Sequence, residues 1–298
     1  MSGPTAVLYD QPGPRGRLVN RLASVVALLL VLGAGYWVYA KLDETDQWAA
    51  EKWEPLVQAD VWENFFIPGI EGTLRAFALA AVLALLFGLV FGMARMSTIA
   101  PVRWVGGVVV EFFRSVPLLI LMFAIYYLWS ITLGQTPNIY MAVVLGLMLY
   151  NGSVLAEVLR AGVASLPAGQ AEAGLAVGLR RTQVMLSIQL PQAVRAMLPA
   201  IIAQLVVLLK DTALGYILAY NELVNQVNKV SRGNTLQVIV VVALIYILMN
   251  FSLSGLATWL EGRLGRSRGS TGTVHVDPGM SAVAGMVPGG AVTGSRGT

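Results

Sequence analysis

Six long runs of apolar residues limit what this chain can fold into. They cover residues 22–40, 72–94, 115–133, 139–159, 196–219 and 236–260. A helix of about 20 apolar residues crosses the hydrocarbon of a bilayer with all its backbone hydrogen bonds satisfied internally. Charged residues make up only 12% of the chain and the mean hydropathy is +0.70, which is outside the range of ordinary globular domains. The sequence therefore predicts an all-α polytopic membrane protein with about six transmembrane helices.

The first run could be either a cleaved signal peptide or a retained helix. It is longer than the apolar part of a usual signal peptide. No pattern of small residues typical of a cleavage site follows it in the stretch YWVYAKLDETDQ. We therefore expect residues 22–40 to remain as a transmembrane helix, preceded by an N-terminal tail over residues 1–21.

The placement of lysine and arginine predicts the orientation. Three arginines lie in residues 1–21, whereas the segment 41–71 carries two lysines against eight acidic residues. Loops rich in lysine and arginine stay on the cytosolic side, so the N-terminus is expected in the cytosol. Six crossings return the C-terminus to the same side. Lys229 and Arg232 fall outside in this topology and oppose the trend.

Two long segments lie outside the predicted helices. The acidic segment 41–71 contains Trp48, Trp53 and Trp62, which suits a partly helical linker at the outer membrane interface. A solvated linker is the alternative. The tail 261–298 is rich in Gly, Ser, Thr and Pro and lacks apolar periodicity, so we expect it to be disordered in the cytosol.

Several classes of chemistry are excluded by composition. The chain has no cysteine, and its single histidine, His275, lies in the Gly-rich tail, so thiol catalysis and metal sites are not expected. It has no GxxxxGK[ST] loop, so it should not hydrolyse ATP by itself. Its basic residues form no patch, so no nucleic-acid partner is expected. We expect a protein that is not an enzyme and holds no cofactor.

One polar stretch, residues 167–178, lies between the fourth and fifth runs. Pro167 suits a helix N-terminus, Glu172 is placed in an early turn, and Gly178 can end the helix. The residues between them are mostly alanine and glycine, which offer too little apolar area to hold a helix by themselves. Two interpretations are open: the helix docks on another protein, or it only connects two crossings.

The same stretch resembles the EAA loop of bacterial ABC importer permeases. The usual pattern is EAA, three residues, Gly, nine residues, Ile, one residue, then Leu-Pro, and every spacing is matched. The matching residues are Glu172, Ala173, Gly174, Gly178, Ile188, Leu190 and Pro191. In that family this loop is the coupling helix, which inserts into a cleft on the ATP-hydrolysing subunit.

The resemblance implies a cytosolic coupling loop over residues 161–195. Its candidate contacts with the ATPase subunit are Gly169, Gln170, Glu172, Ala173, Gly174, Gly178, Leu190 and Pro191. Gly174 replaces the second alanine of the pattern. Restoring alanine there should favour the helix by up to about 1 kcal/mol, so we expect Gly174→Ala to be tolerated.

Further motifs resemble the polar amino acid branch of these permeases, the histidine and glutamine type. They are Gly72–Leu74 (GTL), FRSVPLL from residue 113, AEVLRAGVASLPAGQ from residue 156 and KDTAL from residue 210. The resemblance covers residues 72–260 and implies the five-helix core of a type I importer permease. The run 22–40 is then an added N-terminal helix. The YNGSVLAE stretch and the glycine at 174 look more similar to glutamate-uptake members than to basic amino acid ones.

The resemblance also implies a set of partners. A working complex would contain two cytosolic ATP-binding subunits, a second permease subunit that is identical or homologous, and an external amino-acid-binding protein. ATP would be bound by the partner, and an amino acid would be the substrate. The chain would lie in the bacterial cell membrane with both termini in the cytosol.

Charged residues inside the fifth run need a separate explanation. Lys210 and Asp211 would each cost about 3 kcal/mol facing lipid, so we expect them to face the bundle interior or an aqueous cavity. Gln204 lies seven residues before Asp211 and shares its helical face. Candidate residues for a translocation path are Gln204, Lys210, Asp211 and Thr212. The alternative is an ion pair that only fixes helix packing.

Two further charge pairs are spaced three residues apart: Glu111 with Arg114, and Glu157 with Arg160. This spacing places both members on one side of a helix. We therefore expect intrahelical pairs near the cytosolic boundary.

Two other classes of function remain open. A secondary amino acid transporter driven by an ion gradient would also need several helices and a few intramembrane charges. Such transporters usually show internal repeats, and none is visible here. A structural membrane scaffold is the third possibility, which would show no substrate flux.

Overall fold

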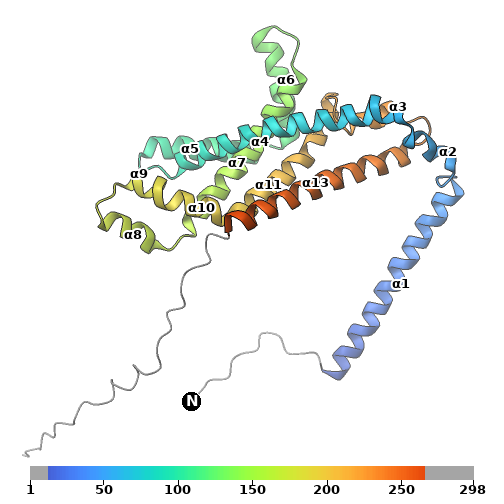
Figure 1. Cartoon of the computed structure of the whole chain (residues 1–298), viewed down its shortest axis with the longest axis horizontal. Helices are drawn as coiled ribbons and strands as arrows, with labels where there is room; N and C mark the ends of the chain where they lie inside the picture. Colours follow the sequence, from blue (N-terminus) through green and yellow to red (C-terminus); the bar gives the residue numbers. More distant parts are fainter. Residues whose placement is uncertain (1–12, 266–298) are drawn as a thin grey trace, which may run out of the picture.

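The computed structural model describes residues 13–265, and this part of the chain folds into helices without a strand (Figure 1). The longer helices are α1 (Pro14–Glu44), α4 (Ile67–Arg95), α5 (Ala100–Ser115), α6 (Leu118–Leu133), α7 (Ile139–Ala164), α11 (Leu198–Asp211) and α13 (Thr235–Gly265). The shorter ones are α2 (Ala50–Trp53), α3 (Ala59–Val61), α8 (Ala168–Ala176), α9 (Arg181–Val184), α10 (Leu190–Ala196) and α12 (Asn225–Val230). Between them lie the 3₁₀ segments η1 (Glu54–Val57) and η4 (Thr212–Leu218) and the π-helical segments η2 (Trp62–Phe66) and η3 (Met185–Gln189).

Small residues set the contact between α4 and α7 at the centre of the fold. A Cβ atom on Gly88 would lie 2.8 Å from Cβ of Leu155, and one on Gly92 would lie 3.1 Å from the carbonyl oxygen of Ala156. Glycine therefore allows the two backbones to approach closely, as is common between membrane helices. Residue numbers rise together along this contact, so α4 and α7 run parallel.

Because α4 and α7 are parallel, the chain between them must cross back, and it does so as a broken span. The helices α5 and α6 are joined at Val116 and Pro117 and bend by 104°. Helix α6 lies within the predicted run 115–133, but the break at Val116 and Pro117, which separates it from α5, was not predicted. A proline lacks the backbone N–H that a helix interior needs, and the residue before it is pushed to extended backbone, as Val116 is. Among residues 13–265, five helices are long and apolar enough to span a membrane, and the number of crossings is six if the bent pair counts as one span.

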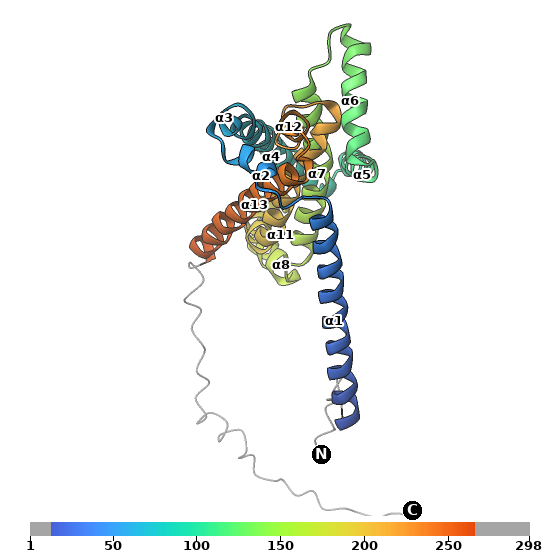
Figure 2. The same cartoon turned by 90° about the vertical axis from the view of Figure 1, so that its right-hand side faces the viewer.

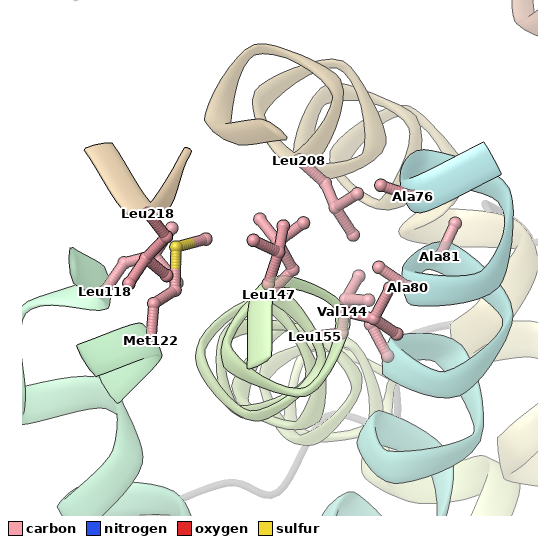
Figure 3. Close-up of a cluster of buried hydrophobic side chains, with 12 residues drawn as sticks. Ala76, Ala80, Ala81, Leu118, Met122, Val144, Leu147, Leu155, Leu208 and Leu218 are labelled. Atoms are coloured by element: carbon pink, nitrogen blue, oxygen red, sulfur yellow. The ribbon is translucent and has the colours of Figure 1, made fainter. Parts of the chain in front are cut away.

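The main core surrounds α7. Val144 of this helix lies beside the alanines of α4, and Leu147 lies between Met122 of α6 and Leu208 of α11 (Figure 3). On the other side, Met122 of α6 packs against α7, where a Cβ on Gly146 would come within 2.6 Å of its Cγ. The polar residues discussed below are carried by α7 and α11, so this packing fixes their positions.

The acidic segment before α4 is packed and helical. Helix begins at Ala59 and continues through η2 to Arg95, so the first core helix starts before the predicted residue 72. Leu56 and Phe66 are buried against α12 and α13. The amide of Gln237 donates to the carbonyl oxygen of Gln47 at 2.7 Å. The segment is therefore helical and packed rather than fully solvated, and its place at the outer membrane interface stays a prediction.

Helix α1 stands apart from this bundle (Figure 2). None of its residues is buried by the rest of the chain, and Tyr39 stacks on Trp48 with ring centroids 5.7 Å apart. It begins at Pro14, inside the predicted tail 1–21, and α13 continues past the predicted end to Gly265. The remainder of both predicted tails, residues 1–12 and 266–298 with His275, lies outside the described residues.

Helices α8 and α2 lie at opposite ends of the bundle (Figure 1). We call these the α8 end and the α2 end.

Candidate functional site

The polar stretch between α7 and α11 folds as a short helical unit at the α8 end. Helix α8 covers Ala168–Ala176, which confirms the helix predicted for residues 167–178. Gly178 follows it with a φ of +87°, a conformation that glycine adopts without the strain of a side chain. Glu172 is the fifth residue of α8, so it lies in the second turn rather than the first. Its predicted interaction with the helix dipole is therefore weaker than expected.

One side of α8 is buried by its own chain. A Cβ atom on Gly174 would lie 2.9 Å from Cγ2 of Val184 and 3.0 Å from Cδ1 of Ile188. The structure argues against the expectation that Gly174→Ala is tolerated, because the side chains of Val184 and Ile188 would have to shift to admit the added methyl group. Gly174 serves packing on α9 and η3, and only the other side of α8 is free.

The exposed side of α8 contains most of the predicted contact residues. Gly169, Gln170, Glu172 and Ala173 are all exposed, and Gly178 is exposed just after the helix. Leu190 and Pro191 begin α10 and directly precede Gln192, which faces α8, and Ala193, which faces α7. The amide of Gln192 donates to Oε1 of Gln170 at 3.4 Å and to the carbonyl oxygen of Ile188 at 2.9 Å.

A cavity of about 490 Å³ lies beside α8. Met93 and Met96 of the α4 end form one wall, and Leu175, Arg181 and Met185 of the coupling stretch form the other. Methionine side chains are flexible and can repack around a changing neighbour. The cavity thus separates the α8 unit from the end of α4, and its methionine lining can adapt if the two move relative to each other.

A group of charged residues lies at the same end. Arg160 contacts Glu157 at 2.6 Å, and Arg114 contacts Glu111 at 2.7 Å, which confirms both predicted intrahelical pairs. Nη1 of Arg95 also contacts Oε2 of Glu157 at 2.9 Å. Sequence reasoning missed this third arginine because it comes from α4, which is distant in the chain.

In the middle of the bundle, amide side chains connect α7 to α11. Nε2 of Gln204 donates to Oδ1 of Asn151 at 2.6 Å. Nδ2 of Asn151 lies 3.5 Å from Oδ2 of Asp211 and also donates to the carbonyl oxygen of Leu147 at 3.2 Å. Gln204 and Asp211 therefore share a face, as predicted. Asn151 is fully buried between them and was not singled out, although an asparagine inside an apolar run is itself a signal.

Lys210 and Thr212 do not belong to this cluster. Among the described residues, no ion pair joins Lys210 to Asp211, so the predicted structural pairing is not found. Lys210 is exposed toward α13 instead. Thr212 is buried, and its hydroxyl donates to the carbonyl oxygen of Leu209 at 2.6 Å, so it caps its own helix.

A buried carboxylate near the α2 end was also missed. Glu222 is 0% exposed and accepts hydrogen bonds from the backbone N–H groups of Val224 and Asn225, both at 2.8 Å, and from the hydroxyl of Tyr246 at 3.0 Å. Burial raises the pKa of this carboxyl to about 7, although the three donors favour its charged form. Glu222 therefore fixes the start of α12 against α13.

Comparison with known proteins identifies close relatives. The family described as "Binding-protein-dependent transport system inner membrane component" matches residues 84–266. The glutamate transport system permease protein of Corynebacterium glutamicum is 45% identical over 234 residues, which are 76% of this chain and 85% of that protein. The L-cystine transport system permease protein of Bacillus subtilis is 32% identical over 217 residues, covering 71% of this chain and 91% of that protein.

A solved structure has the same fold. The crystal structure of an amino acid ABC transporter with histidines matches with a TM-score of 0.61 at 28% identity, and it covers 66% of this chain and 93% of that one. The match extends over nearly the whole of that subunit. The helices described above are therefore arranged as in a known transport protein.

Proposed function

Because this chain belongs to the family of binding-protein-dependent transport system inner membrane components, we propose that it imports an acidic amino acid, most simply glutamate. Membership makes it a multi-pass membrane protein and the permease subunit of an amino acid ABC importer, which is not an enzyme. The observation that carries the choice of glutamate is the 45% identity with a glutamate permease over 85% of that protein. The family also favours an ATP-driven importer over a transporter driven by an ion gradient.

We place the α8 end in the cytosol, in agreement with the arginines that flank the apolar runs. The exposed side of α8, with Gly169, Gln170, Glu172 and Ala173, then docks on a cytosolic ATP-binding subunit. Gly174 lies on the opposite side of α8, where the absence of a side chain lets the helix pack closely against Val184. Gly178, Leu190 and Pro191 shape the chain that returns from α8 to the membrane. Movement of the ATPase subunit would reach the bundle through this unit.

The cluster of Asn151, Gln204 and Asp211 supports a polar contact point for the substrate on the translocation path. Asp211 is half-buried, and its one hydrogen-bond partner among the described residues is the amide of Asn151 at 3.5 Å. A carboxylate with remaining acceptor capacity is complementary to the α-ammonium group of an amino acid. Gln204 holds the Asn151 side chain in place through its 2.6 Å hydrogen bond.

The partners follow from the same proposal. Two ATP-binding subunits would supply energy, a second permease subunit would complete the path, and an external binding protein would deliver the amino acid. The α2 end would face that protein, and both termini would lie in the cytosol.

Purification and reconstitution test this proposal. The tagged chain is purified from its native membrane, the accompanying subunits are identified, and the complex is placed in vesicles with the binding protein. We expect uptake of glutamate that requires ATP and continues after ion gradients are collapsed. Uptake by this chain alone on an ion gradient would refute the proposal.

A further inference from the structure

The cavity beside α8 gathers apolar surface that the chain itself does not cover. Its volume is about 490 Å³, and most of its lining is apolar. Three of its aliphatic side chains are strongly exposed: Ile99 (60%), Leu186 (53%) and Leu175 (43%). Apolar surface that surrounds one hollow is costly in water, so we expect an apolar group to cover it in the working protein.

The charge at this cavity is positive. Arg181 is the one charged residue among the described residues that line it. On the wall formed by the end of α4, Nη1 of Arg103 donates to the carbonyl oxygen of Ser97, a lining residue, at 3.0 Å. Among the described residues, no ion pair joins either guanidinium group to an acid. Two cations without a counter-charge, next to the hydroxyl groups of Thr98 and Thr182, favour an anionic ligand.

The cavity lies at the depth where lipid tails meet lipid headgroups. The membrane span that contains α4 runs over Ala59–Arg95, and the lining residues Met93 and Met96 lie at its end. With the α8 end in the cytosol, this is the level of the headgroups of the inner leaflet. Basic pockets at the cytosolic ends of transmembrane helices bind the headgroups of anionic lipids.

A ligand in this cavity would leave the docking surface of α8 free. Ala171 and Leu175 line the cavity and are spaced by four residues, so they lie on one side of α8. Gly169 and Ala173 do not line it and are exposed on the opposite side of the helix. Helix α8 can therefore contact a ligand on one side and the ATP-binding subunit on the other at the same time.

We propose that this cavity binds an anionic phospholipid of the inner leaflet, which bridges the α8 unit and the end of α4. The guanidinium groups of Arg103 and Arg181 bind the phosphate of the headgroup, and an acyl chain covers Ile99, Leu175 and Leu186. The lipid replaces a gap between the two units by a contact, so coupling depends on the charge of the membrane. This inference rests on the proposed function, which places the α8 end in the cytosol, and adds a lipid site to it.

Lipid binding to the purified permease–ATPase complex tests the inference. The probes are fluorescent phosphatidylglycerol, which is anionic, and fluorescent phosphatidylcholine, which has no net charge. We expect the wild type to bind phosphatidylglycerol at least about fivefold more tightly than phosphatidylcholine. Arg181→Gln and Arg103→Gln should each weaken phosphatidylglycerol binding by about fivefold, and the double variant should abolish the preference. Ile99→Asn should weaken both lipids, because it removes apolar contact without removing charge.

A matched control is the neighbouring arginine. Arg180 is exposed and does not line the cavity, so Arg180→Gln should bind both lipids as the wild type does. A loss in Arg180→Gln equal to that in Arg181→Gln would show only attraction to a positive surface and would overturn the inference. An unchanged preference in the double variant would also overturn it.

The same complex gives a functional readout. In vesicles of phosphatidylcholine with added phosphatidylglycerol, ATPase stimulation by loaded binding protein should exceed that in phosphatidylcholine alone, and the double variant should lose this difference. Absence of specific lipid binding, together with a crosslink from Leu175→Cys to the ATP-binding subunit, would show that the subunit fills the cavity and would refute the lipid site. Failure of the proposed function is a different result, because the wild type would then show no ATP-dependent uptake in vesicles of either composition.

Discussion

Replacing Gly174 should loosen α8 from the rest of the chain and weaken coupling to ATP hydrolysis. Alanine would gain up to about 1 kcal/mol of helix propensity. Its Cβ atom, however, would lie 2.9 Å from Val184 and 3.0 Å from Ile188, where carbon atoms prefer about 3.5–4.0 Å. Overpacking of this kind costs about 1–3 kcal/mol. The net effect is a loss of up to about 2 kcal/mol for Gly174→Ala, and a larger loss for Gly174→Val because valine adds two more methyl groups.

The assay is the number of amino acid molecules imported per ATP hydrolysed in reconstituted vesicles. A loss of 1–2 kcal/mol shifts the docking equilibrium of α8 by a factor of roughly 5–30, so the ratio should fall in Gly174→Ala and further in Gly174→Val. Gly107→Ala is the control, because that helical glycine on α5 has no atom within 4 Å of an added Cβ. The chain has no cysteine, so Ala173→Cys gives a crosslink to the ATPase subunit without background. A normal ratio and a normal crosslink in Gly174→Val would refute the packing argument.

Three further predictions concern the helix surface, the amide cluster and the buried acid. Ala173→Trp adds bulk to the exposed side of α8 and should abolish ATPase stimulation by loaded binding protein while the chain stays inserted; full stimulation would count against docking. Asn151→Leu leaves the Gln204 amide without its partner, a cost of about 1–3 kcal/mol, and should reduce uptake more than Gln204→Leu does. The pKa of Glu222 is raised from 4.5 to about 7, so its contribution to stability is present below pH 4.5 and lost as pH rises through 7, by about 3 kcal/mol. Glu222→Gln should flatten the fall in melting temperature between pH 4.5 and 7, and an unchanged profile would exclude this carboxyl as the cause.

Local sequence patterns predicted the parts of the fold that depend on local physics. Pro167 and Gly178 bound α8 because a missing N–H and a positive φ act within one turn. The break at Pro117 was missed because run length measures only apolar content, although the proline is itself the signal. The partners of Gly174 and Asn151 come from other helices, and no spacing rule within one segment could reveal them.

The sequence could not predict which neighbouring helix each of the two adjacent charges of α11 faces. The cost of a charge in lipid predicts that Lys210 and Asp211 face protein or water, but consecutive residues on a helix point about 100° apart. One of them therefore reaches α7 while the other reaches α13, and only the packing of three helices decides which. Asn151 lies beside Asp211, and among the described residues no acid pairs with Lys210, so the two charges face different helices and a variant of one is expected to leave the surroundings of the other unchanged.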